Sequence, residues 1–186
     1  MNWDETTPYT TTTSQFNGRD QAVSLRQYEG SESGTNPFQV GVMTYDGHGR
    51  LKSQHKPEQS AGSNTTFNYN MDDSIESVID ARGAIESRNY EARGLLISKS
   101  YTVPQGSDIP VTPTISFQYD SVGNRTQMSD ETGTTAYHYD QLSRITSETK
   151  TFNQISSDVG MPNQVTVSYE YGLTSLKKVI YPDSRQ

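Results

Sequence analysis

The sequence lacks several features that define common protein classes. It contains no cysteine among its 186 residues, which excludes a disulfide framework, a cysteine-ligated zinc site and a thiol nucleophile. No apolar run approaches the ~18 residues of a membrane-spanning helix, so we expect no membrane partner. The net charge is −7 and lysine and arginine do not cluster, so we expect no nucleic-acid partner either.

Aliphatic residues are also scarce. Leucine, isoleucine, valine and phenylalanine make up 32 of the 186 residues, a proportion below the ~20% under which a chain struggles to build a core. Serine, threonine, asparagine and glutamine make up 68 residues, and tyrosine is abundant at 12. Threonine and tyrosine favour β-strands, so the composition predicts an all-β chain whose strands bury one modest face.

A repeated pattern of about 20 residues dominates the sequence. The segments 43–53, 117–128 and 136–147 each contain a tyrosine followed by an aspartate, a turn and a second strand, and in the latter two segments a further aromatic residue stands two positions before that tyrosine. A period of this length indicates a repeat array and not one closed globule. We assign the array to residues 16–186 and a polar, Thr-rich segment to residues 1–15, and we expect loops near 53–66, 101–114 and 152–164.

The turns share an acidic residue followed three positions later by glycine. An aspartate at the first turn position accepts backbone N–H groups, and a glycine at the fourth adopts the left-handed conformation. The pairs are Asp46/Gly49, Asp80/Gly83, Glu91/Gly94, Asp120/Gly123 and Asp130/Gly133. At Asp140 the fourth residue is Ser143, so that turn is either strained or of another type.

The flanking strands alternate, so that Ile115, Phe117 and Tyr119 share one face. Each repeat is therefore interpreted as an antiparallel β-hairpin with an aromatic face. Because aliphatic residues are few, we expect tyrosine to supply most of the packing area between hairpins. The alternative is that the tyrosine rings form an exposed platform for a sugar.

The strings YDGHGRL (45–51), YDSVGNRT (119–126) and YDQLSRIT (139–146) resemble the YD-repeat, or RHS-repeat, family. The resemblance implies tandem hairpins that form a curved strip or partial shell. It also implies a scaffold role, as in bacterial polymorphic toxins and toxin-complex subunits whose shell encloses a C-terminal toxic domain, or in teneurins at animal cell surfaces. The localisation it implies is secreted or cell-surface, in a bacterium.

The sequence departs from the family in one respect. Family shells close with a segment rich in Asp-Pro-x-Gly where self-cleavage occurs, and no Asp-Pro pair is present here. We therefore expect an array truncated at both ends, whose partners are flanking YD repeats and an enclosed effector domain of the same polypeptide.

We predict no catalytic, metal-binding or cofactor-binding residue, because the Tyr-Asp pairs recur in many turns and the histidines His48, His55 and His138 are scattered. The arginines that open the return strands are expected to pair with the aspartate of a neighbouring turn. The predicted structural positions are Tyr45, Asp46, Gly49, Arg50, Tyr69, Asp80, Gly83, Tyr90, Gly94, Tyr119, Asp120, Gly123, Arg125, Asp130, Gly133, Tyr139, Asp140, Arg144, Tyr169 and Tyr171.

Two functional hypotheses follow. The first is a non-enzymatic wall or scaffold. The alternative is a carbohydrate- or protein-binding module at a cell surface. In either case, strands without a neighbour at the ends of the array would favour self-association.

Overall fold

The computed structural model describes residues 10–29, 37–153 and 162–182, and these residues form strands and turns without a helix. In this part of the chain no helix therefore exists that could cross a membrane. The strands are β1 (Thr10–Phe16), β2 (Ala22–Glu29), β3 (Gln39–Tyr45), β4 (Leu51–His55), β5 (Thr65–Tyr69), β6 (Ile75–Ile79), β7 (Ile85–Tyr90), β8 (Leu96–Thr102), β9 (Ile115–Tyr119), β10 (Arg125–Asp130), β11 (Gly133–Tyr139), β12 (Ile145–Phe152), β13 (Gln164–Tyr171) and β14 (Leu176–Ile180).

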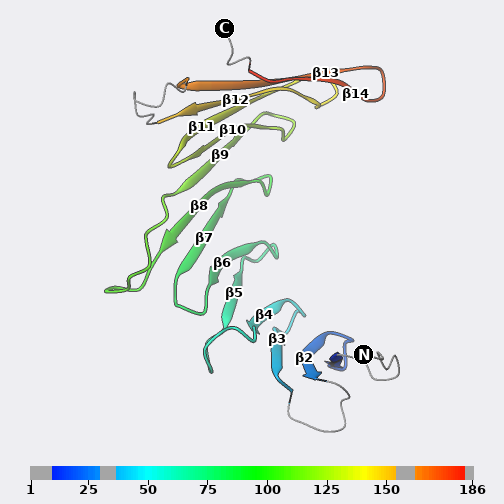
Figure 1. Ribbon diagram of the computed structural model, residues 1–186, viewed down its shortest axis with the longest axis vertical. Helices are drawn as coiled ribbons and strands as arrows, with labels where there is room; N and C mark the ends of the chain where they lie inside the picture. The colour runs from blue at the N-terminus through cyan, green and yellow to red at the C-terminus, as the bar shows by residue number, and fades with distance from the viewer. Residues whose placement is uncertain (1–9, 30–36, 154–161, 183–186) are drawn as a thin grey trace, which may run out of the picture. The chain divides into compact units, whose positions relative to one another are not determined.

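The chain divides into two compact units. The first comprises Met1–Glu86 and Val103–Ile109, and the second comprises Ser87–Thr102 and Pro110–Gln186. Within each unit the strands lie side by side in the order of the chain, and the paired strands are antiparallel (Figure 1). The prediction of an all-β chain of tandem antiparallel hairpins is confirmed.

The hairpin turns have a common backbone geometry. In the turn of β9 and β10, the amide of Gly123 donates to the carbonyl of Asp120 and the amide of Asp120 donates to the carbonyl of Asn124. Gly123 has a φ of 96°. Such a left-handed residue produces a bulge beside the turn, and the β9–β10 register shifts between Arg125 and Gln127.

Ser143 adopts the conformation of a turn glycine. Its φ is 58°, and its amide donates to the carbonyl of Asp140 just as Gly123 donates to Asp120. Asp20 and Asp73 occupy the same fourth position in their turns, with φ values of 57° and 67°. Of the two alternatives left open by the sequence, a strained version of the same turn is therefore correct for Ser143.

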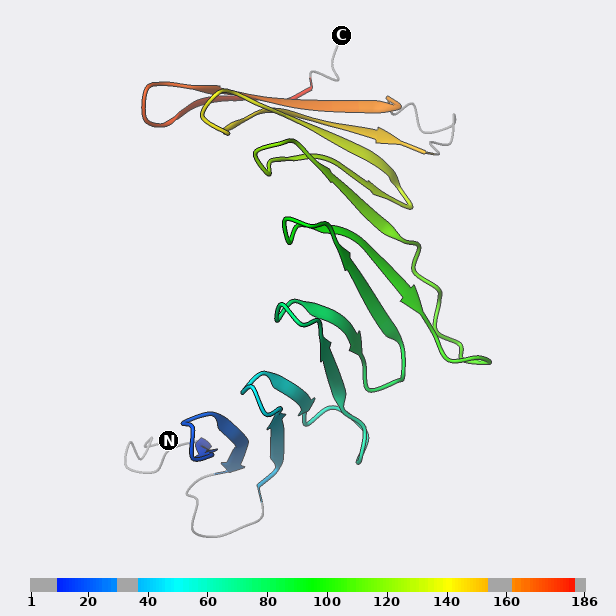
Figure 2. The ribbon, with the colours of Figure 1, turned by 180° about the vertical axis from the view of Figure 1, so that it is seen from behind.

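Two Asp-x-x-Gly motifs do not lie at hairpin tips. Turns of the hairpins gather at one side of each unit, whereas the links from one hairpin to the next lie at the other side (Figure 2). The Asp80–Gly83 turn follows β6 and precedes β7, and it therefore links two hairpins. Asp130 pairs with Gly133 across a two-residue link between β10 and β11.

Gly133 is required by a close approach as well as by its conformation. Its φ is 143°, and a Cβ atom at this position would lie within 1.9 Å of the carbonyl oxygen of Thr151. The Asp130/Gly133 motif thus matches the turn motif in sequence but differs from it in structure. In this link Asp130 and Gly133 are themselves paired strand residues, and only two residues lie between them.

The strands extend further than the sequence patterns indicate. The segment assigned to residues 1–15 contains most of β1, which pairs with β2 from Thr10 onward. The predicted loops are shorter: residues 56–64 separate β4 from β5, and residues 103–114 separate β8 from β9. The third loop begins after Phe152, and its residues 154–161 lie outside the described part. The strand ends contain polar threonine, serine and glutamine residues, which do not alternate with apolar residues. The sequence pattern therefore predicted strands that are shorter than those observed.

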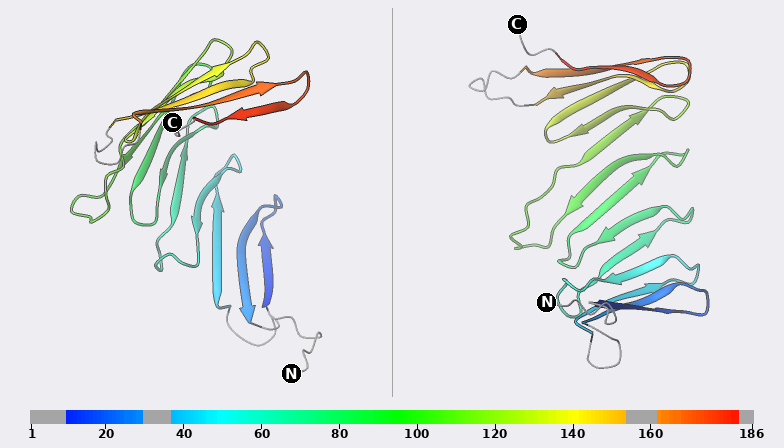
Figure 3. Two further views of the ribbon diagram at one scale, coloured as in Figure 1. Left: turned by 45° about the horizontal axis from the view of Figure 1, so that its top comes forward. Right: turned by 45° about the vertical axis from the view of Figure 1, so that its right-hand side comes forward.

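Each unit is a single-layered sheet (Figure 3), and almost no side chain of the described residues is buried. In the described ranges, Tyr28 at 7% exposure is the one buried hydrophobic residue. The strands instead have a half-buried face and a polar face, as in β9, where Ile115, Phe117 and Tyr119 alternate with exposed residues. Stability therefore depends on contacts between adjacent hairpins more than on a shared core.

Replacing Ser143 by glycine is expected to stabilise the protein. Glycine removes the steric cost of a left-handed backbone at φ 58°, and we expect a gain of about 1 kcal/mol over alanine at this position. Thermal melts of Ser143→Gly and Ser143→Ala test this, because both substitutions remove the hydroxyl and only one relieves the backbone. An alanine variant as stable as the glycine variant would contradict it.

Candidate functional site

In five turns the side chain at the first position holds the turn closed. Oδ1 of Asp140 accepts the amides of Leu142 and Arg144 at 2.9 and 3.0 Å. An aspartate side chain is short enough to accept the backbone amides two and four residues further along the chain, so an aspartate at the first position favours the turn. The same two-amide acceptance occurs at Asn17, Asp46, Asp80 and Asp120.

In two turns the second carboxylate oxygen binds the arginine that immediately precedes the return strand. Oδ2 of Asp46 lies 2.7 Å from Nε of Arg50, and Oδ2 of Asp140 lies 2.7 Å from Nε of Arg144. Arg50 and Arg144 therefore each pair with the aspartate of their own turn, whereas the sequence led us to expect a pair with the aspartate of a neighbouring turn. The backbone brings the two side chains together because positions one and five of the turn close on each other.

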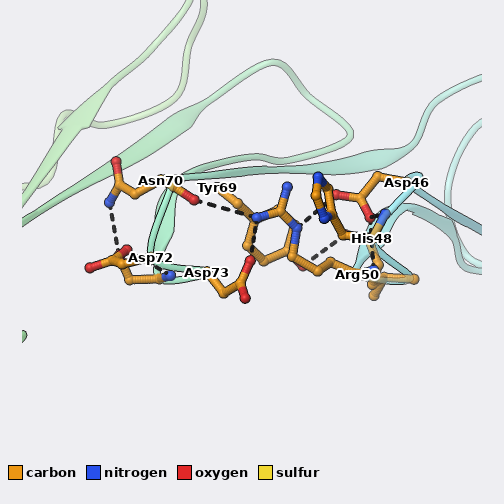
Figure 4. A network of polar contacts seen from close by, with 9 residues as sticks. Asp46, His48, Arg50, Tyr69, Asn70, Asp72 and Asp73 are labelled. Atoms are coloured by element: carbon orange, nitrogen blue, oxygen red, sulfur yellow. Dashed lines mark hydrogen bonds and ion pairs between the residues drawn. The ribbon is translucent and has the colours of Figure 1, made fainter.

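Arg50 also reaches the next hairpin (Figure 4). Its Nη1 lies 2.7 Å from Oδ1 of Asp73 and 3.4 Å from the carbonyl oxygen of Asn70. Its guanidinium lies over the ring of Tyr69, 4.5 Å from the centroid. One arginine thus joins its own turn, the following turn and the following tyrosine by a cation–π contact.

Arg144 repeats this arrangement in the second unit. Its guanidinium lies 4.5 Å from the centroid of Tyr171, and its Nη1 donates to the carbonyl oxygen of Gly172 at 3.3 Å. Other turns also donate forward, to the backbone of the hairpin that follows in the chain. These donors are Arg19 to Gly47, Gln21 to Gly49 and Arg93 to Asp120 and Ser121.

In four hairpins the tyrosine that ends the first strand donates backward, to the hairpin that precedes it in the chain. The hydroxyl of Tyr119 donates to the carbonyl of Leu96 at 2.9 Å. Leu96 is the first residue of the return strand in the preceding hairpin. The same contact joins Tyr45 to Ala22, Tyr69 to Leu51 and Tyr139 to Arg125, at 2.8, 2.8 and 2.9 Å.

Together these contacts form what we call the turn ladder. It consists of the first-position carboxylates and amides, the forward-donating arginines and glutamine, and the backward-donating tyrosine hydroxyls. Sequence patterns indicated the turn aspartates, two of the arginines and the tyrosines, but not Asn17, Arg19, Gln21 and Arg93. They did not indicate the carbonyl acceptors of the tyrosine hydroxyls either, since any residue can supply a carbonyl.

Arg125 is placed differently from Arg50 and Arg144. It follows Asn124, whose amide occupies the fifth turn position and donates to Oδ2 of Asp120 at 2.9 Å. The guanidinium of Arg125 instead lies between Phe117 and Tyr137, 5.8 and 4.7 Å from their centroids. Arg125 therefore contributes packing and a hydrogen bond to Tyr137 in place of the expected pair with a turn aspartate.

The remaining predicted positions lie at three kinds of place. Gly49, Gly83 and Gly94 take positive φ in their turns, at 85°, 86° and 76°. Tyr90 and Tyr171 end β7 and β13. Near the end of β13, the hydroxyl of Tyr169 lies 3.2 Å from Oε1 of Glu148.

The histidines do not converge. His48 lies inside a turn and donates its amide to Asp46, while His138 is exposed on the polar face of β11. His55 ends β4, and not a loop as the sequence indicated, and its Nδ1 lies 2.7 Å from the carbonyl oxygen of Ser63. Within the described residues, no three histidine, aspartate or glutamate side chains are grouped to hold a metal ion.

Hydrogen bonding lowers the pKa values of the turn aspartates. The amide of Arg144, followed by its guanidinium, lowers the pKa of Asp140, and partial burial opposes this. At Asp46, burial acts most strongly and would raise the pKa, but hydrogen bonds from the Arg50 amide and guanidinium outweigh it and the pKa is lowered. The side chain of Thr132 lowers the pKa of Asp130 in the same way.

The fold and the turn ladder define a class: a repeat protein of antiparallel hairpins, each joined to its neighbours by a recurring set of contacts. A family model described as the RHS repeat matches residues 119–154. This match confirms the resemblance drawn from the YD strings in that part of the chain. No curated protein matches the sequence.

Solved structures share the fold. A structure entitled "Crystal Structure of TcdB2-TccC3-Cdc42" matches with a TM-score of 0.54 and 14% identity, over 90% of this chain and 10% of that one. A second, "Crystal Structure of TcdB2-TccC3-TEV", has the same TM-score and identity over 91% of this chain and 11% of that one. The chain thus spans about a tenth of the length of these relatives.

Removing one ladder hydroxyl should destabilise the protein. In Tyr119→Phe the carbonyl of Leu96 loses its donor, and we expect a cost of about 1 kcal/mol in the free energy of unfolding. The matched control is Tyr181→Phe, at a ring that is 72% exposed. Urea titrations of both variants measure the difference; equal stability would show that the hydroxyl contact carries no weight.

Acid should weaken the turn ladder. The pKa values of Asp46, Asp120 and Asp140 are lowered in the folded chain, so the stability they contribute is present above the ordinary aspartate pKa of about 3.9 and is lost as the pH falls below it. Melting temperatures measured from pH 7 to pH 3 should fall at the acidic end. Asp140→Asn should reduce the loss of melting temperature at acidic pH. Asn17 accepts the same two backbone amides in its own turn, and an asparagine does not titrate. If the melting temperature of this variant fell with pH as steeply as that of the parent protein, the contribution assigned to Asp140 would be wrong.

Proposed function

We propose that this chain is a stretch of wall in an RHS-type β-shell, a non-enzymatic scaffold that encloses a C-terminal toxin or effector domain of the same polypeptide. The observation that supports this most strongly is the turn ladder. Its contacts repeat from hairpin to hairpin, and they satisfy the same carboxylates and hydroxyls that a catalytic site would have to leave available.

Few side chains are buried among the residues that the structure describes, and this also supports a wall. A domain that folds around its own core buries many side chains, whereas a single-layered sheet stabilised by its neighbours can be lengthened without rebuilding a core. The relatives of similar fold are about ten times longer than this chain, as expected if such hairpins form part of a larger structure.

The partners proposed for this wall are further hairpins. In the described residues, β1 and β14 each have a strand neighbour on one side. Unpaired strand edges bind other strands readily, so each can accept a hairpin from flanking repeats or, in an isolated chain, from a second copy.

Enclosure can be tested by limited proteolysis of the full polypeptide that contains these repeats. We expect a C-terminal effector segment to resist protease in the intact protein. Gly123→Val should expose it, because a β-branched residue cannot hold φ 96° in the turn between β9 and β10. His138→Ala, at an exposed position of β11, is the control.

The proteolysis result separates a wall from an independent module. Protection that is lost in Gly123→Val and kept in His138→Ala would support enclosure. Digestion of the C-terminal segment at the same rate in all three proteins would contradict it, as would a polypeptide in which no domain follows the repeats.

A further inference from the structure

The outer edge of β14 is an interaction surface whose partner can be specified. β14 (Leu176–Ile180) pairs with β13 on one side, and the described residues place no strand on its other side. Such an edge presents backbone donors and acceptors that an added strand can bind. The strand that fits this edge follows from the junctions between hairpins that the array already contains, because those junctions share one geometry.

Five junctions between successive hairpins have the same register. In each, the third residue of the return strand pairs with the residue three positions before the tyrosine that ends the next strand, as Ser147 pairs with Ser168 ahead of Tyr171. The other pairs are Ser24 with Val42, Ser53 with Thr66, Ser98 with Ser116 and Gln127 with Ala136. A slip of one residue would turn the tyrosine to the other face of the sheet, so the register and the tyrosine contact depend on each other.

Leu176 occupies the position that accepts the tyrosine of a following hairpin. In four junctions the carbonyl oxygen of the first return-strand residue accepts that tyrosine hydroxyl, as Leu51 accepts from Tyr69. β14 begins in the same way, since Leu176 pairs with the tyrosine that ends β13 just as Leu51 pairs with the one that ends β3. Leu51 is half-buried, whereas Leu176 is 50% exposed. A following tyrosine would cover this leucine with its ring and bind its carbonyl with its hydroxyl.

We propose that the edge of β14 binds, in trans and in antiparallel register, a hairpin whose first strand ends in tyrosine. The shared register places Lys178, the third residue of β14, opposite the residue three positions before that tyrosine. The tyrosine hydroxyl then donates to the carbonyl oxygen of Leu176. This inference rests on the wall proposed above and specifies the partner of one of its edges.

A second copy of the chain matches this edge less well than a tyrosine-bearing hairpin does. The outer strand of its first hairpin, β1, ends in Phe16, which has no hydroxyl to donate to Leu176. Two β14 edges would set Lys177 and Lys178 of one copy near the same lysines of the other. Like charges that face each other across paired strands are destabilising, so the edge favours the hairpin over its own copy.

The absence of cysteine from the chain allows the register to be tested by disulfide trapping. The probe is a synthetic peptide of residues 133–153, which spans β11 and β12, with Ala136→Cys three positions before Tyr139. Under mild oxidation, the 186-residue chain with Lys178→Cys should trap this peptide about 10-fold faster than a peptide with Thr135→Cys. Side chains directly opposite each other lie close enough for a disulfide, whereas the neighbouring residue points to the other face.

Adding Tyr139→Phe to the Ala136→Cys peptide should slow trapping about 3- to 10-fold, because the hydroxyl that binds the carbonyl of Leu176 is lost. The control chain carries His138→Cys, at an exposed residue of a strand with neighbours on both sides, and should trap neither peptide above background. Circular dichroism confirms that both chain variants keep the parental β spectrum.

Three results would overturn the proposal. The first is trapping of the Ala136→Cys peptide no faster than the Thr135→Cys peptide, or no faster by Lys178→Cys than by His138→Cys. The second is an unchanged rate in the Tyr139→Phe peptide. The third is cross-linking of Lys178→Cys chains to one another in preference to the peptide, which would show that the edge takes a second copy. Enclosure is measured separately by the proteolysis experiment, so either proposal can fail without the other.

Discussion

The bond from a tyrosine hydroxyl to a backbone carbonyl of the preceding hairpin connects most features of this structure. In a sheet with one buried hydrophobic residue among those described, the packing of side chains cannot fix how hairpins meet. A directed hydrogen bond can, because Tyr139 reaches the carbonyl of Arg125 only when the two hairpins are in register. The aromatic ring supplies area at the same contact, and at Tyr69 the guanidinium of Arg50 covers the ring. Directed hydrogen bonds thus fix how neighbouring hairpins pack, which in ordinary domains is determined by the burial of hydrophobic side chains.

The turn aspartates extend the same principle to the local backbone. Asp140 satisfies two amides and one guanidinium with two oxygen atoms, so a five-residue turn closes without apolar contact. Where the acid is absent the turn still forms, as Asn17 shows with an amide that bonds Gln21. The array therefore tolerates substitution at single positions, provided that the replacement supplies a similar set of donors and acceptors.

How far the sequence predicts this structure depends on the range of each interaction. The turn at Asp120 and the alternation of β9 are local, and both were visible in the residue pattern. The partner of Tyr119 was not, because the carbonyl of Leu96 leaves no mark in sequence. Ser143 shows that a non-glycine residue can take the left-handed position when its neighbours impose it.

The arginines and the tyrosines give the array a polarity. Arg144 donates toward the hairpin that follows it, and Tyr139 donates toward the hairpin that precedes it. The two flanks of a hairpin of this kind are therefore chemically unlike: one presents a carbonyl that accepts from a tyrosine, and the other presents a tyrosine hydroxyl that donates to a carbonyl. Two such strips would join head to tail with complementary bonds, whereas a head-to-head junction would set donor against donor. Gene duplication of single hairpins preserves this complementarity automatically, which offers a physical route by which such arrays grow.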